Sequence, residues 1–71
     1  MPESIYKVIE LIGSSPISWE DAVKNVVETA SKSLRDLRIA EVKELDVKLD
    51  DTGKIAAYRA KVSLSFKYEK D

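Results

Sequence analysis

The 71-residue chain contains no cysteine and no histidine. Without cysteine it can form no disulfide and no thiolate metal site, and without histidine it has no imidazole ligand and no histidine pH switch. The same absences exclude Ser-His and Cys-His catalytic pairs. A chain of this length buries only about 60% of the surface that its unfolded form exposes, so its own core is small. Oligomerisation is therefore the expected source of further stability.

The charge is balanced, because twelve basic residues face thirteen acidic ones and leave a net charge of −1. A protein that binds nucleic acid through electrostatics needs a basic face, which this balance does not favour. The apolar stretches are far shorter than the roughly 20 residues of a membrane helix, and residues 1–4 do not resemble the start of a secretory signal. We therefore expect a cytoplasmic protein without a nucleic-acid or membrane partner.

Two turn signals divide the chain. Residues 13–16, Gly-Ser-Ser-Pro, combine a glycine, which allows positive φ, with a proline, which disfavours helix in the residue before it. Residues 50–53, Asp-Asp-Thr-Gly, form a polar cluster that ends in glycine. There is no repeat and no low-complexity segment, so we expect one domain over residues 1–71.

The segment from about Ser4 to Ile12 is predicted to be a strand with apolar side chains on both faces. Glu10 interrupts one of these faces. This interruption indicates that the strand lies near a sheet edge or that the carboxylate has a partner.

Residues from Ser18 to about Leu37 have the pattern of an amphipathic helix. Ser18 and Asp21 form a variant of the capping box, in which the serine hydroxyl accepts an N–H of the first turn. The apolar stripe consists of Trp19, Ala22, Val23, Val26, Val27, Ala30, Leu34 and Leu37.

Two further strands are expected, from about residue 38 to 49 and from about residue 54 to 68. The apolar residues of the former change face halfway, which predicts a β-bulge or bend near Lys43 or Glu44. The latter alternates regularly and would span roughly 50 Å, more than the width of so small a monomer. The order β-α-β-β predicts an α+β fold, in which a three-stranded antiparallel sheet wraps around one helix and leaves exposed edges.

Few residues suggest chemistry. Asp50 and Asp51, with Thr52, could give oxygen ligands to a hard cation such as Ca²⁺, although turn chemistry alone favours a solvated hairpin turn. Trp19 could stack on an aromatic ligand or anchor the helix to the core. The arginines (Arg35, Arg38 and Arg59) could clamp an anion or pair with nearby acids. No paired acids lie in an evident cleft, so we do not expect an enzyme.

Three segments together resemble the dodecin family: residues 6–16 (YKVIELIGSSP), residues 37–42 (LRIAEV) and residues 58–66 (YRAKVSLSF). The resemblance covers nearly the whole chain and includes its length and the order of its elements. It implies a hollow dodecamer built from four trimers, and it is greatest to the calcium-associated members of the family. Typical dodecins bind flavins in pairs and store them.

The resemblance also implies a ligand-binding set of Ile39, Glu41 and Arg59. Ile39 stands where typical dodecins have the tryptophan that stacks on the flavin ring, and Arg59 stands where they have a glutamine that contacts the ring edge. Isoleucine has no stacking face, and arginine has donors but no acceptor. We therefore expect weak flavin binding.

Three functions remain open at this stage. The leading hypothesis is a non-enzymatic dodecin-like oligomer that binds or sequesters a small ligand or ion, with Ca²⁺ favoured and Asp50 and Asp51 as the metal candidates. The second is a flavin-binding dodecin, for riboflavin or FMN, with an atypical pocket. The third is a structural shell without a ligand.

Overall fold

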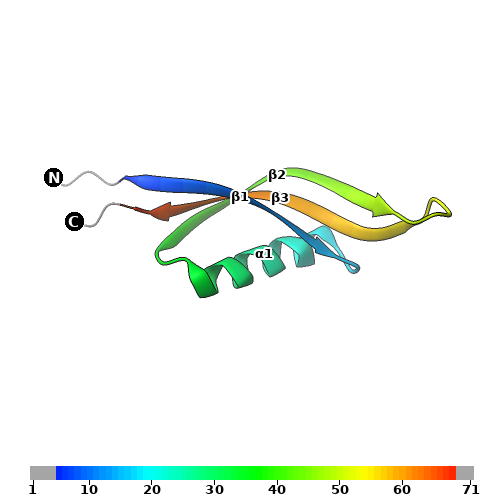
Figure 1. The fold of residues 1–71 in the computed structure, drawn as a ribbon, viewed down its shortest axis with the longest axis horizontal. Helices are drawn as coiled ribbons and strands as arrows, with labels where there is room; N and C mark the ends of the chain where they lie inside the picture. The colour runs from blue at the N-terminus through cyan, green and yellow to red at the C-terminus, as the bar shows by residue number, and fades with distance from the viewer. Residues whose placement is uncertain (1–4, 69–71) are drawn as a thin grey trace.

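The computed structural model describes residues 5–68. Its elements follow the order β1 (Tyr6–Ser15), α1 (Trp19–Ser33), β2 (Leu37–Leu49) and β3 (Ile55–Lys67). The three strands form one sheet in the order β1-β3-β2, with every pair antiparallel. The helix lies against one face of this sheet, and the β2–β3 hairpin extends beyond it (Figure 1). The expected α+β fold with β-α-β-β topology is confirmed.

The central strand β3 carries the most buried residues of the sheet. Ala60, Val62 and Leu64 are fully buried and face the helix, as the regular alternation of this strand predicts. On the helix, Ala22, Val26 and Ala30 complete the buried core. The sheet is long and narrow, since the molecule measures 57 × 20 × 15 Å. The unusually long third strand therefore projects past the helix instead of closing around it.

Helix α1 begins as predicted, because the Ser18 hydroxyl accepts a hydrogen bond from the backbone N–H of Asp21. Its predicted end at Leu37 is wrong. Leu34 caps the helix with extended backbone dihedrals while its N–H still bonds to the carbonyl of Ala30. The chain then turns at Asp36, which has a positive φ of 56°. Leu37 instead opens β2 opposite Phe66, where its apolar side chain is partly buried against the core.

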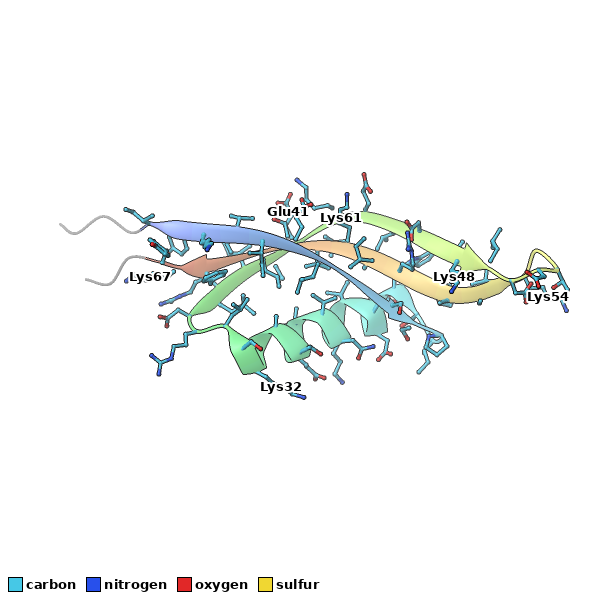
Figure 2. The ribbon with its side chains drawn as sticks, in the orientation of Figure 1. Lys32, Glu41, Lys48, Lys54, Lys61 and Lys67 are labelled. Carbon is cyan, nitrogen blue, oxygen red and sulfur yellow. The ribbon has the colours of Figure 1, made fainter. Side chains whose placement is uncertain are left out.

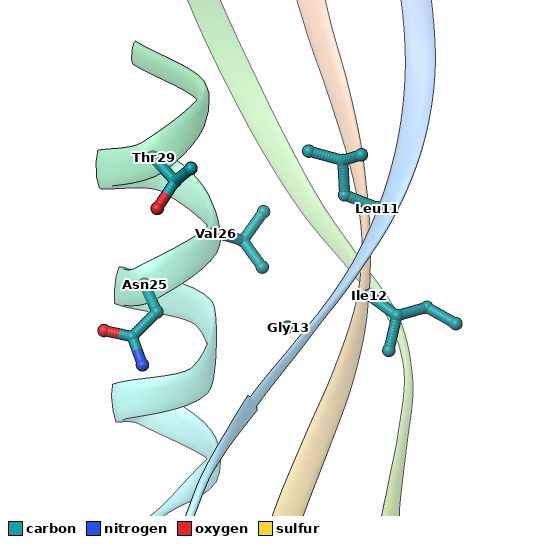
Figure 3. Close-up of a pocket in the computed structure, with 6 residues that line it drawn as sticks. All are labelled: Leu11, Ile12, Gly13, Asn25, Val26 and Thr29. Carbon is teal, nitrogen blue, oxygen red and sulfur yellow. The ribbon is translucent and has the colours of Figure 1, made fainter. Parts of the chain in front are cut away.

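Strand β1 continues to Ser15, three residues beyond its predicted end, and the predicted start at Ser4 lies outside the described residues. Gly13 is a strand residue here, paired with Ala60. A Cβ at this position would overlap the side chain of Val26 and lie 2.7 Å from the carbonyl oxygen of Ala22. Figure 3 shows Val26 pointing from the helix toward this part of β1. The glycine therefore serves close helix–strand packing, not a turn.

The predicted bulge in β2 is confirmed, because the pairing with β3 shifts between Val42 and Glu44 and leaves Lys43 without a partner position. Two further shifts, near each end of β2, were not predicted. The β2–β3 turn is where the polar cluster indicated, with Gly53 at a φ of 83°. α1, the helix within residues 5–68, is not long and apolar enough to cross a membrane.

Candidate functional site

One face of the sheet is not covered by the helix, and we call it the outer face. Residues that pair directly across strands point to the same side of a sheet, so the pairing defines its members. β3 contributes Arg59, Lys61, Ser63, Ser65 and Lys67, β1 contributes Tyr6, Val8, Glu10, Ile12 and Ser14, and β2 contributes Ile39, Glu41, Glu44, Asp46 and Lys48. Figure 2 shows Glu41 and Lys61 projecting away from the helix.

All three predicted ligand residues lie on this outer face, but a single protomer does not bring them together. Ile39 is opposite Ser65, and Glu41 is opposite Ser63, so these two are near neighbours on β2. Arg59 lies six residues along β3 from Ser65, a distance of about 20 Å at the usual rise of a strand. A pocket that used all three would need more than one copy of the chain.

Arg59 is held by an acid that the sequence analysis did not single out. Its Nε donates to Asp46 Oδ1 at 2.7 Å, and its Nη2 donates to Oδ2 at 2.9 Å. The two residues are direct partners across β2 and β3. This bidentate hydrogen bond lowers the pKa of Asp46 and raises the pKa of Arg59. The guanidinium therefore has an acidic partner within the protomer, and its role as a ligand residue stays a prediction.

The remaining outer-face charges pair less closely. Lys61 Nζ lies 3.7 Å from Glu44 Oε1, directly across the strands. Lys43 Nζ, on the bulge, lies 3.9 Å from Glu41 Oε2. Both pairs are well exposed, and exposed ion pairs contribute little to stability.

The hairpin acids have different roles. Asp50 Oδ1 accepts three hydrogen bonds, from the N–H of Thr52 at 2.8 Å, its hydroxyl at 2.7 Å and the N–H of Lys54 at 3.0 Å. These bonds, led by the Thr52 hydroxyl, lower the pKa of Asp50. Asp51 is exposed beside it. The Asp50 carboxylate therefore organises the turn in the protomer, as the turn chemistry suggested.

Within residues 5–68 no three acidic side chains gather closely enough to hold a metal ion. A hard cation such as Ca²⁺ requires six to eight oxygen ligands. A calcium site on this chain would thus need backbone or hydroxyl oxygens, water or a second subunit.

Trp19 anchors the start of the helix to the sheet. Its indole N–H donates to the carbonyl of Asp46 at 3.0 Å, and its ring meets Tyr58 edge-to-face with centroids 5.1 Å apart. It also lines a cavity of about 210 Å³ with Glu20, Val23, Val42 and Leu45. The anchoring role is confirmed by these contacts, and the ring lies on the helix side, away from the outer face.

The surface of the protomer is rich in large apolar side chains. Val8, Ile12 and Ile39 are each more than half exposed on the outer face. Between β1 and the helix, Leu11, Ile12, Gly13, Asn25, Val26 and Thr29 line a further hollow of about 240 Å³ (Figure 3). Such exposure is unusual for a monomer and is typical of surfaces that meet other chains.

The amino-acid sequence matches one known protein family over nearly its whole length. The dodecin family profile matches residues 5–69. The calcium dodecin of Mycobacterium tuberculosis is 50% identical over 64 residues, which cover 90% of this chain and 89% of that protein. The dodecin of Thermus thermophilus is 32% identical over 65 residues, covering 92% and 93%.

Solved structures agree with this match. The dodecin of Streptomyces coelicolor superposes with a TM-score of 0.89 at 34% identity and covers 100% of both chains. The crystal structure of the Mycobacterium tuberculosis calcium dodecin, described as calcium chelating with a novel calcium-binding site, has a TM-score of 0.82 at 47% identity and covers 96% of each chain. On sequence and fold alike, the chain belongs to the dodecin family.

Proposed function

We propose that this chain assembles into a hollow dodecamer that binds a small ligand or ion without catalysis, and that Ca²⁺ is the favoured ligand. The observation that carries the proposal is the outer face, which presents acidic side chains and has isoleucine at the position of the flavin-stacking tryptophan. The 50% identity to a calcium dodecin supports the same ligand. We also propose a cytoplasmic location and no nucleic-acid partner.

Assembly is supported by how little the protomer buries. Its core cluster consists of six buried apolar residues (Ala22, Val26, Ala30, Ala60, Val62 and Leu64). Meanwhile Val8, Ile39 and Leu45 are 56%, 61% and 51% exposed. Both β1 and β2 are edge strands with open backbone groups. Burying these surfaces against other copies would supply the apolar contact that the protomer lacks. The dodecameric form follows from the family.

Calcium is favoured over flavin on chemical grounds. Ile39 can give apolar contact to a ring but no π-face, and the Trp19–Tyr58 pair lies on the helix side. Carboxylate and hydroxyl oxygens are what Ca²⁺ prefers. The hairpin acids Asp50 and Asp51 are one proposed source of these ligands, with the remaining oxygens from a neighbouring subunit or water.

An aromatic ligand such as riboflavin or FMN is the second candidate. One observation favours it: Tyr6, Lys7 and Tyr68 line an open cavity of about 260 Å³ at the end of the sheet opposite the hairpin. Two tyrosine rings could stack on a flat aromatic molecule, and the lysine could pair with a phosphate such as that of FMN. A shell without any ligand is the third candidate.

Native mass spectrometry of the protein purified from its own host separates these candidates, because it reports subunit number and bound mass together. We expect twelve subunits with bound Ca²⁺ and no flavin. A flavin mass would favour the second candidate, and an empty dodecamer that takes up no added Ca²⁺ would favour the third. A folded monomer of 8.0 kDa would contradict the proposed assembly.

A further inference from the structure

Three side chains with oxygen atoms lie in one row across the outer face. Ser63 of the central strand pairs with Glu10 of β1 on one side and with Glu41 of β2 on the other. The backbones of neighbouring strands are about 4.8 Å apart, so the backbones of the two glutamates lie about 10 Å from each other, on either side of the serine. A glutamate side chain is long enough to bring its carboxylate over the serine between them. The row therefore puts the space above Ser63 within reach of both carboxylates.

The serine at the centre of this row is buried and lacks a hydrogen-bond partner. Ser63 is only 9% exposed, although its side chain is on the face that the helix does not cover. No hydrogen bond is formed by its hydroxyl within residues 5–68. Over the same residues, no fully buried side-chain oxygen lacks a partner, so the hydroxyl must keep an opening to solvent. The pairing places this hydroxyl on the outer face between Glu10 and Glu41.

The charges of the outer face distinguish this row from the next two. In those rows the acid of β2 faces a cation of β3, as Glu44 faces Lys61 and Asp46 faces Arg59. In the row of Ser63, two acids face a neutral hydroxyl. Glu10 forms no ion pair within the described part of the chain.

The cation nearest to this row belongs to the bulge. Lys43 Nζ is 3.9 Å from Glu41 Oε2, and the two side chains are 44% and 65% exposed. A pair this exposed is weak. It leaves the row with a net negative charge that a divalent ion can neutralise.

We propose that Glu10, Ser63 and Glu41 form a binding site for a hard divalent cation, with Ca²⁺ as the best match. The inference rests on the proposed ion-binding function and places the ion on the sheet, away from the hairpin acids. Two carboxylates and one hydroxyl offer up to five oxygens, and water or a neighbouring subunit completes the six to eight that Ca²⁺ takes. Mg²⁺ demands a more regular octahedron of ligands and fits this flexible pair of glutamates less well.

The test is isothermal titration calorimetry of the assembled, metal-stripped protein with CaCl₂. Glu10→Gln and Glu41→Gln keep the side-chain shape and remove one charge each, and we expect each to weaken Ca²⁺ binding by at least tenfold. Ser63→Ala removes only the hydroxyl and should weaken binding by a smaller but measurable factor. Glu44→Gln is the matched control, since it makes the same change on the same strand and face, one row away, and should bind as the wild type does.

Asp50→Asn/Asp51→Asn removes both hairpin carboxylates, which are the other proposed source of ligands, and decides between the two locations, since it should weaken Ca²⁺ binding only if the hairpin holds the ion. Each variant is first shown to assemble by gel filtration in EDTA. If the wild type binds Ca²⁺ and both glutamine variants bind it equally well, the sheet site is wrong while the calcium function stands. If only the hairpin double variant loses Ca²⁺ binding, the sheet site is likewise wrong and the calcium function stands. If the wild type gives no binding heat with Ca²⁺, the proposed calcium function itself is overturned.

Discussion

At the scale of single residues, the ligand preference depends on what stands at position 39. Ile39 is 61% exposed on the outer face, so a larger side chain can be accommodated there without disturbing the core. We expect Ile39→Trp to gain riboflavin binding, because aromatic stacking on a flat heterocycle contributes about 1–3 kcal/mol per ring in other systems. Quenching of riboflavin fluorescence during titration measures this gain.

Ile39→Leu is the control for that experiment, since it keeps an apolar side chain but adds no ring. It should quench no more strongly than the wild type. Strong quenching by the wild type would contradict the expectation of weak flavin binding and favour the second candidate function.

The Asp46–Arg59 pair contributes to the stability of the folded protein, and the direction in which this contribution changes with pH can be predicted. The pKa of Asp46 is lowered in the folded protein by its hydrogen bonds with Arg59. A lowered folded-state pKa means that the stabilisation is complete above the ordinary value of 3.8 and is lost as the pH falls through the folded value. We therefore expect Asp46→Asn to lower the melting temperature slightly at pH 7, and the difference from wild type to shrink as the pH falls below 3.8 and to vanish once it is below the lowered folded-state pKa.

Arg59→Met tests the same pair from the other side. It should lower the melting temperature at pH 7 as Asp46→Asn does, with the same loss of the difference from wild type at low pH. The double variant should melt little below either single variant, because both substitutions remove the same interaction. High salt should also shrink the effect, since the pair is exposed. A difference between Asp46→Asn and wild type that persists unchanged at low pH would contradict this account.

At the scale of elements, the local sequence pattern predicts the helix and the strands, whereas tertiary packing determines where some of them begin and end. The alternation of β3 and the apolar stripe of the helix were sufficient to predict both elements and their buried faces, and the change of face in β2 predicted the bulge at Lys43. The Gly-Ser-Ser-Pro segment predicts a turn at Gly13, whereas the absence of a side chain there lets β1 approach the helix. Leu37 fits helical spacing and strand burial equally, and only Asp36 with its positive φ separates the two.

The candidate site was less predictable for a related reason. Asp46 and Ser63 acquire their roles from strand register, since each matters only through its partner on a neighbouring strand. The sequence did carry one signal, the interruption of an apolar face by Glu10, and β1 is indeed an edge strand. Register depends on the two additional irregularities of β2, which no local pattern revealed.

The contact between Gly13 and the helix can be tested directly. Gly13→Ala would place a methyl group against Val26 and the carbonyl oxygen of Ala22. Overpacking of this kind costs about 1–3 kcal/mol, and we expect the free energy of unfolding to fall by that amount. Chemical denaturation followed by circular dichroism measures it.

A double-mutant cycle with Val26→Ala identifies the cause. Val26→Ala alone should destabilise the protein, because it leaves a cavity in the core. The double variant should be more stable than the sum of the two single changes, since the smaller side chain makes room for the new methyl group. Strict additivity would show that the cost of Gly13→Ala comes from the nearby backbone and not from Val26.

At the scale of the whole molecule, we expect the thin protomer to gain much of its stability from assembly. The molecule is 57 Å long, but its sheet is covered by a helix of only 15 residues. At the hairpin end only β2 and β3 continue past the Ser15–Tyr58 pair, and an isolated two-stranded hairpin is marginally stable in water. The far end of β2 and β3 therefore needs contacts from other copies, and folding should be coupled to assembly.

This coupling predicts a melting temperature that depends on protein concentration. When only the assembled form is stable, dilution favours dissociation and therefore unfolding. We expect the melting temperature to rise over a hundredfold increase in protein concentration, measured by differential scanning calorimetry in EDTA to exclude bound ions. Leu45→Asp, at a side chain that is 51% exposed in the protomer, should lower the melting temperature and strengthen its concentration dependence.

Lys24→Asp supplies the control, because Lys24 is an exposed residue on the polar face of the helix, and the substitution introduces the same side chain with a larger change of charge than Leu45→Asp. It should change the concentration dependence little. If Leu45→Asp behaved in the same way, its side chain would lie outside any interface. A melting temperature independent of concentration, together with sedimentation of the wild type as a folded monomer, would show that the protomer is stable by itself and that the exposed apolar residues serve some other purpose.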